Sequence, residues 1–204
     1  MSITTKRPPL KQTVGAQYLC FNNASEDGGW SGTYEENVEK TEVVKSVKVS
    51  ESAEQNDVYA SGSVYQSDMT SGADQVEVEV IAFPVETLAR MRGEKVEEGL
   101  HFSGGRRERP YFAYGKVVKY SGSYRLEWYP KCKLAGNSDE VNTSEEKFQE
   151  QNDTINISAY PFNAEGDKKV YIDSSEASFP EGATEEKFFA KPILTKEDLT
   201  AALK

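Results

Sequence analysis

The sequence of 204 residues has one histidine and two cysteines, so it offers few residues for catalysis or metal binding. His101 lies beside Phe102 in a polar connector, where a catalytic triad or a metal site would lack partners. Cys20 and Cys132 are far apart in a chain with no export signal, and we expect free, buried thiols. Nucleophile-elbow, phosphate-loop, dinucleotide, histidine metal-binding and EF-hand motifs are absent from the sequence. We therefore expect no catalytic residues, no metal and no cofactor.

Basic residues are also in deficit, with 24 Lys and Arg against 34 Asp and Glu and a net charge of −10. This balance argues against a protein that binds nucleic acid by neutralising phosphates. Long apolar runs are missing as well, since a bilayer-spanning helix needs about 20 such residues, and we expect no membrane partner. The amino-terminal residues 1–12 lack the apolar core of a signal peptide, so we expect the product to stay in the cytoplasm where it is made.

The clearest pattern that is present predicts a strand and then a short helix over residues 75–93. Pro84 ends the strand because it cannot donate to a ladder, and Gly93 suits the end of a helix. Valines alternate with glutamates in the strand, so we expect one buried face and one solvated face. The buried face would hold Val76, Val78 and Val80, and the solvated face Glu77 and Glu79. In the helix, one face would hold Val85, Leu88, Ala89 and Arg92.

Apolar alternation predicts strands elsewhere too, most clearly a hairpin over residues 111–134 with a turn at Ser121–Gly122. Further strands are expected at 15–21, 38–49, 57–65, 154–162 and 170–172, with an edge segment at 182–192, an irregular connector at 94–110 and polar loops at 66–74 and 136–151. Thr195 and Asp198 form a capping-box-like pair that predicts a terminal helix. The prediction is a mainly β fold, an antiparallel β-sandwich or half-barrel with one internal flanking helix and a short C-terminal helix. Residues 1–14 would be an arm, 15–194 a single β domain and 195–204 a C-terminal helix.

In this order, the segments resemble the major tail tube protein family of long-tailed, non-contractile bacteriophages of Gram-positive hosts. The similar stretches are GAQYLCF, DVYASGSVYQSDMTSGADQVEVEVIAFPVETLARMRGEKV, RPYFAYGKVVKYSGSYRLEWYPKCKLA and NDTINISAYP. No single motif is diagnostic, and the likeness lies in the succession of elements. The basic stretch 104–110 and the C-terminal helix after Lys191 depart from the family or vary within it, so the resemblance does not extend to the surface contacts of these two regions.

The resemblance implies a structural subunit of the virion tail, assembled in the host cytoplasm into six-fold rings that stack into a tube. Its partners would be further copies of itself, the tape measure protein, the tail terminator and the baseplate or distal tail proteins. Genomic DNA would pass through the lumen without specific binding. The alternatives are a related component that forms a single ring, such as a tail completion or baseplate hub protein, and an unrelated β-sandwich binding or adhesion module.

Three groups of residues are candidates for contacts in such an assembly. Because an acidic bore would repel DNA, we hypothesise that Glu77 and Glu79 face the lumen, although outer solvent is the alternative. Ring-stacking contacts would come from the two polar loops, unless these are ordinary solvated loops. The loop candidates are Asp68, Met69, Asp139, Glu140 and Phe148. Arg106, Arg107 and Arg109 form the densest basic cluster, which is either a solvated turn or a partner for acidic loops of a neighbouring copy.

Overall fold

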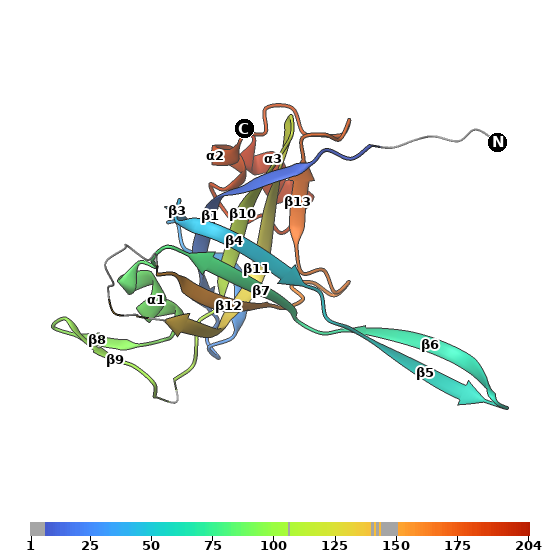
Figure 1. The fold of residues 1–204 in the computed structure, drawn as a ribbon, viewed down its shortest axis with the longest axis horizontal. Helices are drawn as coiled ribbons and strands as arrows, with labels where there is room; N and C mark the ends of the chain where they lie inside the picture. The colour runs from blue at the N-terminus through green and yellow to red at the C-terminus, as the bar shows by residue number, and fades with distance from the viewer. Residues whose placement is uncertain (1–6, 106, 140, 142, 144–150) are drawn as a thin grey trace.

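The computed structural model describes residues 7–105, 107–139, 141, 143 and 151–204, and only the backbone at 54–56, 58–60, 64 and 66–71. Antiparallel strands dominate these residues, with three short helices beside them (Figure 1). The strands are β1 (Lys11–Ala24), β2 (Trp30–Tyr34), β3 (Glu39–Thr41), β4 (Val44–Ser50), β5 (Ala53–Ala60), β6 (Ser63–Ser71), β7 (Asp74–Val80), β8 (Lys95–Glu97), β9 (Leu100–Phe102), β10 (Phe112–Tyr120), β11 (Ser123–Asp139), β12 (Asp153–Ala159) and β13 (Val170–Asp173). The helices are α1 (Val85–Met91), α2 (Glu185–Phe188) and α3 (Lys196–Ala202).

The main sheet curls into a half-barrel, which confirms the predicted fold class. Its strand order is β2-β1-β10-β11-β12-β7-β4, with β3 paired to β1 and β13 to β11. The chain over residues 39–50 closes the curve, because its first part pairs with β1 and its second part with β7. The single strand expected at 38–49 is therefore two strands. The expected hairpin at 111–134 is present, with its turn at Ser121–Gly122 between β10 and β11.

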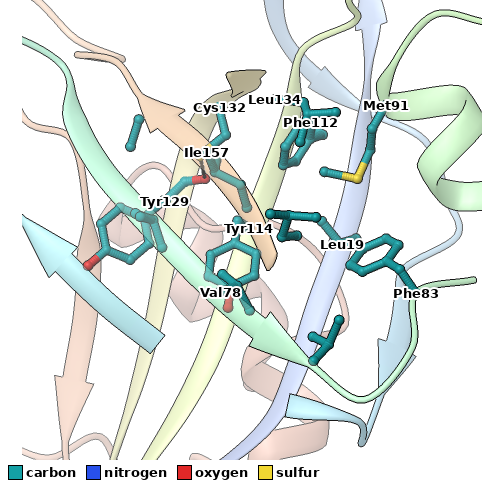
Figure 2. Packing of buried hydrophobic residues seen from close by; sticks show 14 of the residues in the cluster. Leu19, Val78, Phe83, Met91, Phe112, Tyr114, Tyr129, Cys132, Leu134 and Ile157 are labelled. Carbon is teal, nitrogen blue, oxygen red and sulfur yellow. Dashed lines mark hydrogen bonds between the residues drawn. The ribbon is translucent and has the colours of Figure 1, made fainter. Parts of the chain in front are cut away.

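The inside of the half-barrel holds the first of two apolar cores, which we call the interior cluster (Figure 2). Alternate positions of β7, β10, β11 and β12 point into it, as the period of a strand requires. All three valines of β7 are 0% exposed, so the predicted buried face of this strand is confirmed. The interior cluster includes Leu19, Phe21, Val76, Val78, Val80, Phe112, Tyr114, Tyr129, Ile155 and Ile157.

The outer face of β1, β10 and β11 is covered by the C-terminal segment and forms the second core, the outer cluster. Trp128 lies at its centre, with its indole Nε1 donating a hydrogen bond to the Phe188 carbonyl at 3.1 Å. The edge strand predicted at 182–192 is wrong, because Thr184 caps α2 by accepting a hydrogen bond from the Lys187 amide. The capping box of Thr195 is present at α3. The outer cluster includes Ala16, Tyr18, Cys20, Val117, Leu126, Trp128, Phe188, Phe189 and Ile193, with Leu199 and Ala202 of α3 packed against it.

A long hairpin made of β5 and β6, here called the β5–β6 arm, extends away from the half-barrel (Figure 1). The strand predicted at 57–65 is interrupted by a turn and belongs to two strands, and the loop predicted at 66–74 is wrong, because residues 66–71 continue β6. The chain reverses at Ser61–Gly62, where φ is 51° and 77°, and positive φ at both central residues is what tight hairpin turns need. Asp68 and Met69 thus belong to strand β6 and do not lie in a loop.

The internal helix α1 begins after Pro84, as predicted, and the chain leaves it through Gly93 with φ of 66°. A Cβ at Gly93 would lie 2.6 Å from the Glu108 carbonyl oxygen, so both the conformation and the space require glycine. The predicted apolar face is only partly right, because Val85 is 69% exposed while Met91 is fully buried. The connector predicted to be irregular contains the β8–β9 hairpin.

Candidate functional site

The glutamates of β7 lie on the solvated face of the half-barrel, opposite the buried valines. Glu77 is exposed and stands in register with Lys48 of β4 and Asn156 of β12. Glu79 accepts hydrogen bonds from Ser46 Oγ and Asn152 Nδ2, both at 3.0 Å. Charges of both signs therefore share this face. The orientation of Glu77 and Glu79 toward a lumen stays a prediction.

The base of the β5–β6 arm is held by two lysines of one loop, which we call the arm clamp. Lys168 Nζ lies 2.6 Å from Asp74 Oδ1, and the two side chains are 9% and 5% exposed. Lys169 Nζ lies 3.2 Å from Glu51 Oε1 in a more exposed pair. The acids flank the two ends of the arm, so the clamp joins the arm to the loop before β13. Sequence reasoning missed it, because the partners are 94 and 118 residues apart.

The second predicted stacking loop is shorter than expected at its start. Strand β11 continues to Asp139, which pairs in register with Asp153 of β12 and is exposed. The prediction that residues 136–139 belong to a loop is therefore wrong. Glu140 and Phe148 lie outside the described residues. A contact between Asp139 and another copy stays a prediction.

The predicted basic cluster contacts its own chain at the two arginines that are described. Arg107 Nη1 donates to the Phe102 carbonyl at 2.6 Å. Arg109 Nη1 donates to the carbonyls of Leu134 and Ala135 at 2.7 and 2.9 Å. Arg106 lies outside the described residues. The two described guanidiniums thus help to hold residues 107–110 against β9 and β11, while their pairing with a neighbouring copy stays a prediction.

Lysines and aromatic rings gather beside Arg109, in an arrangement that sequence patterns did not predict. Lys133 Nζ lies 4.1 Å from the centre of the Tyr111 ring, and Lys131 Nζ lies 5.0 Å from that of Trp30. Tyr111 also meets Tyr160 edge to face at 6.4 Å. Cation–π contacts of this kind hold the ammonium groups over the rings. The group is formed by strands β2 and β11 and by Tyr111 and Tyr160, which lie outside the strands, and so it depends on the tertiary structure.

The two thiols are free and buried, as predicted. Burial raises the pKa of Cys20 to about 11 and raises that of Cys132 further. Both are therefore protonated and poor nucleophiles at neutral pH.

His101, on the exposed strand β9, has a charged neighbour in Glu94. The distance from His101 Nδ1 to Glu94 Oε2 is 3.5 Å. A hydrogen bond from Ser103, followed by contacts with Arg92 and His101, lowers the pKa of Glu94 despite some desolvation.

Sites for a metal ion were sought as groups of His, Cys, Asp and Glu. The described ranges contain no group of three or more that could hold one. Among the helices of the same residues, none has the length and apolar character needed to cross a membrane.

Comparison with known proteins gives no family for this chain. No protein-family model matches the sequence, and no curated protein matches it. The geometry above and the segment resemblance are therefore the basis for a functional assignment.

Proposed function

We propose that this protein is the structural subunit of a bacteriophage tail tube, which assembles into stacked six-fold rings with a bore for DNA. It acts without catalysis or a cofactor. Its partners are further copies of the same chain, the tape measure protein, the tail terminator and the baseplate proteins. The proposal combines the segment resemblance with a half-barrel that carries a projecting arm and a solvated sheet face.

The β5–β6 arm is the observation that supports this function most directly. In the described structure its two strands pair only with each other, and Tyr65 on the arm is 77% exposed. An isolated two-stranded hairpin is marginally stable in water, so an arm of this length is expected to be completed by another surface. A neighbouring copy in a stacked ring supplies such a surface, and the arm then becomes part of a continuous wall.

The solvated face of β4, β7 and β12 suits the wall of a bore. DNA carries about one negative charge per 1.7 Å of helix axis, and a strongly basic wall would hold it through many phosphate contacts. Here Lys48 stands opposite Glu77, and Glu79 is bound to neutral polar groups. A wall of mixed charge lets the duplex pass without a firm electrostatic hold. The acidic lumen expected from the two glutamates becomes, in this proposal, a lumen of balanced charge.

The test is electron microscopy with negative stain and sedimentation of the purified protein at increasing concentration. Wild-type protein is expected to form tubes or stacked six-fold rings with an open bore. A variant that lacks residues 53–71 should fold, because the Gly72 amide already donates to the Ser52 carbonyl at 3.1 Å and the ends can be joined. We expect this variant to form no tubes, with its free energy of unfolding changed by less than about 1 kcal/mol.

Ser61→Asn is the matched control, since Asn-Gly suits the same turn and keeps the arm. It should assemble like the wild type.

Isolated single rings from wild-type protein would favour a tail completion or baseplate hub component. Wild-type protein that remains monomeric at all concentrations would contradict the proposal and favour a β-sandwich binding module.

A further inference from the structure

A pocket, here called the lysine pocket, lies between the first residues of β1, the first residues of β4 and the middle of β10. Its volume is about 270 Å³. Three of its lining residues are Lys11, Lys45 and Lys116, and Thr13 and Ser46 add hydroxyl groups. In a chain with a net charge of −10, three lysines from three different strands converge on one small space. The two hydroxyl protons are already donated, by Ser46 to Glu79 and by Thr13 to the Val14 carbonyl, so the donors for an oxyanion are the lysine ammonium groups.

Lys116 is the buried member of this group, at 7% exposure. Its Nζ lies 3.3 Å from Glu127 Oε2, but Glu127 also lies 3.7 Å from Arg125 Nη1 and accepts a hydrogen bond from the Tyr129 hydroxyl at 3.4 Å. The carboxylate is thus shared among several donors. Burial lowers the pKa of Lys116, so an anion beside it would stabilise the ammonium form.

A buried polar row leads across the sheet from Lys116. Gln17 stands in register with Lys116 on one side and Thr41 on the other, and Lys116 is in register with Glu127. Directly opposed residues of antiparallel strands point to the same face, so all four side chains lie together. Gln17 is 0% exposed, and neither its amide atoms nor the Thr41 hydroxyl has a hydrogen-bond partner in the described structure. Gln17 and Thr41 lie behind Lys116 and do not line the pocket. Buried polar groups are nearly always paired, so these unpaired groups indicate that a polar species, such as a water molecule or an anion, binds beside Lys116.

We propose that the lysine pocket binds a small oxyanion, a phosphate or a free carboxylate. The pocket has room for such an anion together with several water molecules, since one water molecule needs roughly 10–15 Å³ of such cavity volume. Lys11 and Lys45 form the entrance and Lys116 the inner wall, while Lys45 also donates to Asn152 Oδ1 at 3.1 Å. This site goes beyond the proposed tube function and does not depend on it.

The test is a titration of the unassembled protein with inorganic phosphate, followed by the amide chemical shifts of Gln17 and Lys116. Acetate in a parallel titration distinguishes phosphate from carboxylate binding. We expect saturable binding in the wild type and roughly tenfold weaker binding in Lys116→Met, the usual effect of losing a charged hydrogen bond. Lys119→Met is the matched control, because this lysine of the same strand lines a different pocket. It should bind like the wild type.

A second variant guards against misfolding of Lys116→Met. Lys11→Met combined with Lys45→Met changes side chains at the exposed entrance and should also weaken binding severalfold. Shifts that do not saturate with either anion, or an equal loss in Lys119→Met, would show diffuse counterion binding and overturn the site. Tube formation is measured separately by microscopy, so failure of this site leaves the proposed function standing, and the reverse also holds.

Discussion

Strand β7 and the β5–β6 arm are neighbours in the chain, yet they are stabilised in different ways. β7 pairs with β12 and β4, and its three valines are fully buried in the interior cluster. In the described part of the chain, the strands of the arm pair only with each other. Regular strand geometry alone stabilises a hairpin very little, and burial against further layers supplies the rest. The half-barrel is therefore stabilised by contacts within one chain, whereas the stability of the arm depends on the surface that it contacts.

Only two residues separate the arm from β7, and the arm clamp lies at this boundary. The buried Lys168–Asp74 pair fixes the first residue of β7 against the loop before β13. We expect this pair to keep motion of the arm from reaching the core. Four predictions compare the half-barrel core with the more exposed parts of the molecule.

Removal of a large core side chain should destabilise the half-barrel most. Trp128→Ala removes a fully buried indole and its hydrogen bond to the Phe188 carbonyl. We expect a loss of about 3–5 kcal/mol in the free energy of unfolding, measured by urea denaturation. Tyr171→Ala on β13, where the side chain is 46% exposed, should cost less than about 1 kcal/mol. Equal costs for the two variants would contradict the assignment of Trp128 to a core.

Loss of the clamp should loosen the boundary between half-barrel and arm. Lys168→Met leaves Asp74 buried without its charge partner, and we expect a cost of about 3 kcal/mol. Amide hydrogen exchange should speed up at residues 72–76 while the centre of β10 remains protected. Lys169→Met, which breaks the exposed pair with Glu51, is the control and should cost at most about 1 kcal/mol. Faster exchange in both variants would argue against a special role of the buried pair.

Thiol chemistry offers a finer comparison of the two regions. Cys20 and Cys132 are buried and should react with a thiol reagent at pH 8 only when the protein unfolds. A Ser63→Cys variant places a thiol at the exposed turn of the arm and should react within the mixing time. Slow labelling of that thiol in the unassembled protein would mean that the arm is covered within one chain.

The raised pKa of Cys20 also has a consequence for stability. The folded state retains this proton up to about pH 11, whereas the unfolded state loses it near the ordinary value of 9.0. The contribution is thus fully present below pH 9 and is lost as the pH rises toward 11, with an upper limit of about 2.7 kcal/mol. Urea midpoints at pH 8 and 10.5 should fall less steeply in Cys20→Ala than in the wild type. An equal fall of the urea midpoint in the two proteins would contradict a raised pKa of Cys20.

Local signals in the sequence determined much of the half-barrel. Alternation placed the valines and glutamates of β7 on their correct faces, because a strand has a period of two whatever surrounds it. Ser121–Gly122 marked the central hairpin. The same dipeptide at Ser61–Gly62 lies inside the stretch predicted as a single strand at 57–65. The structure turns there instead, so strand β6 extends through Asp68 and Met69, where the sequence predicts a loop.

The tertiary structure alone decided which distant residues meet. Gln17, Thr41, Lys116 and Glu127 share one row only because four strands pair in a particular register. Lys168 reaches Asp74 across 94 residues, and the C-terminal segment covers Trp128. Periodicity reports which side of a strand is buried, but register depends on the packing of the whole sheet. The sequence by itself thus determined the class of the fold and the faces of its strands, and folding determined the sites.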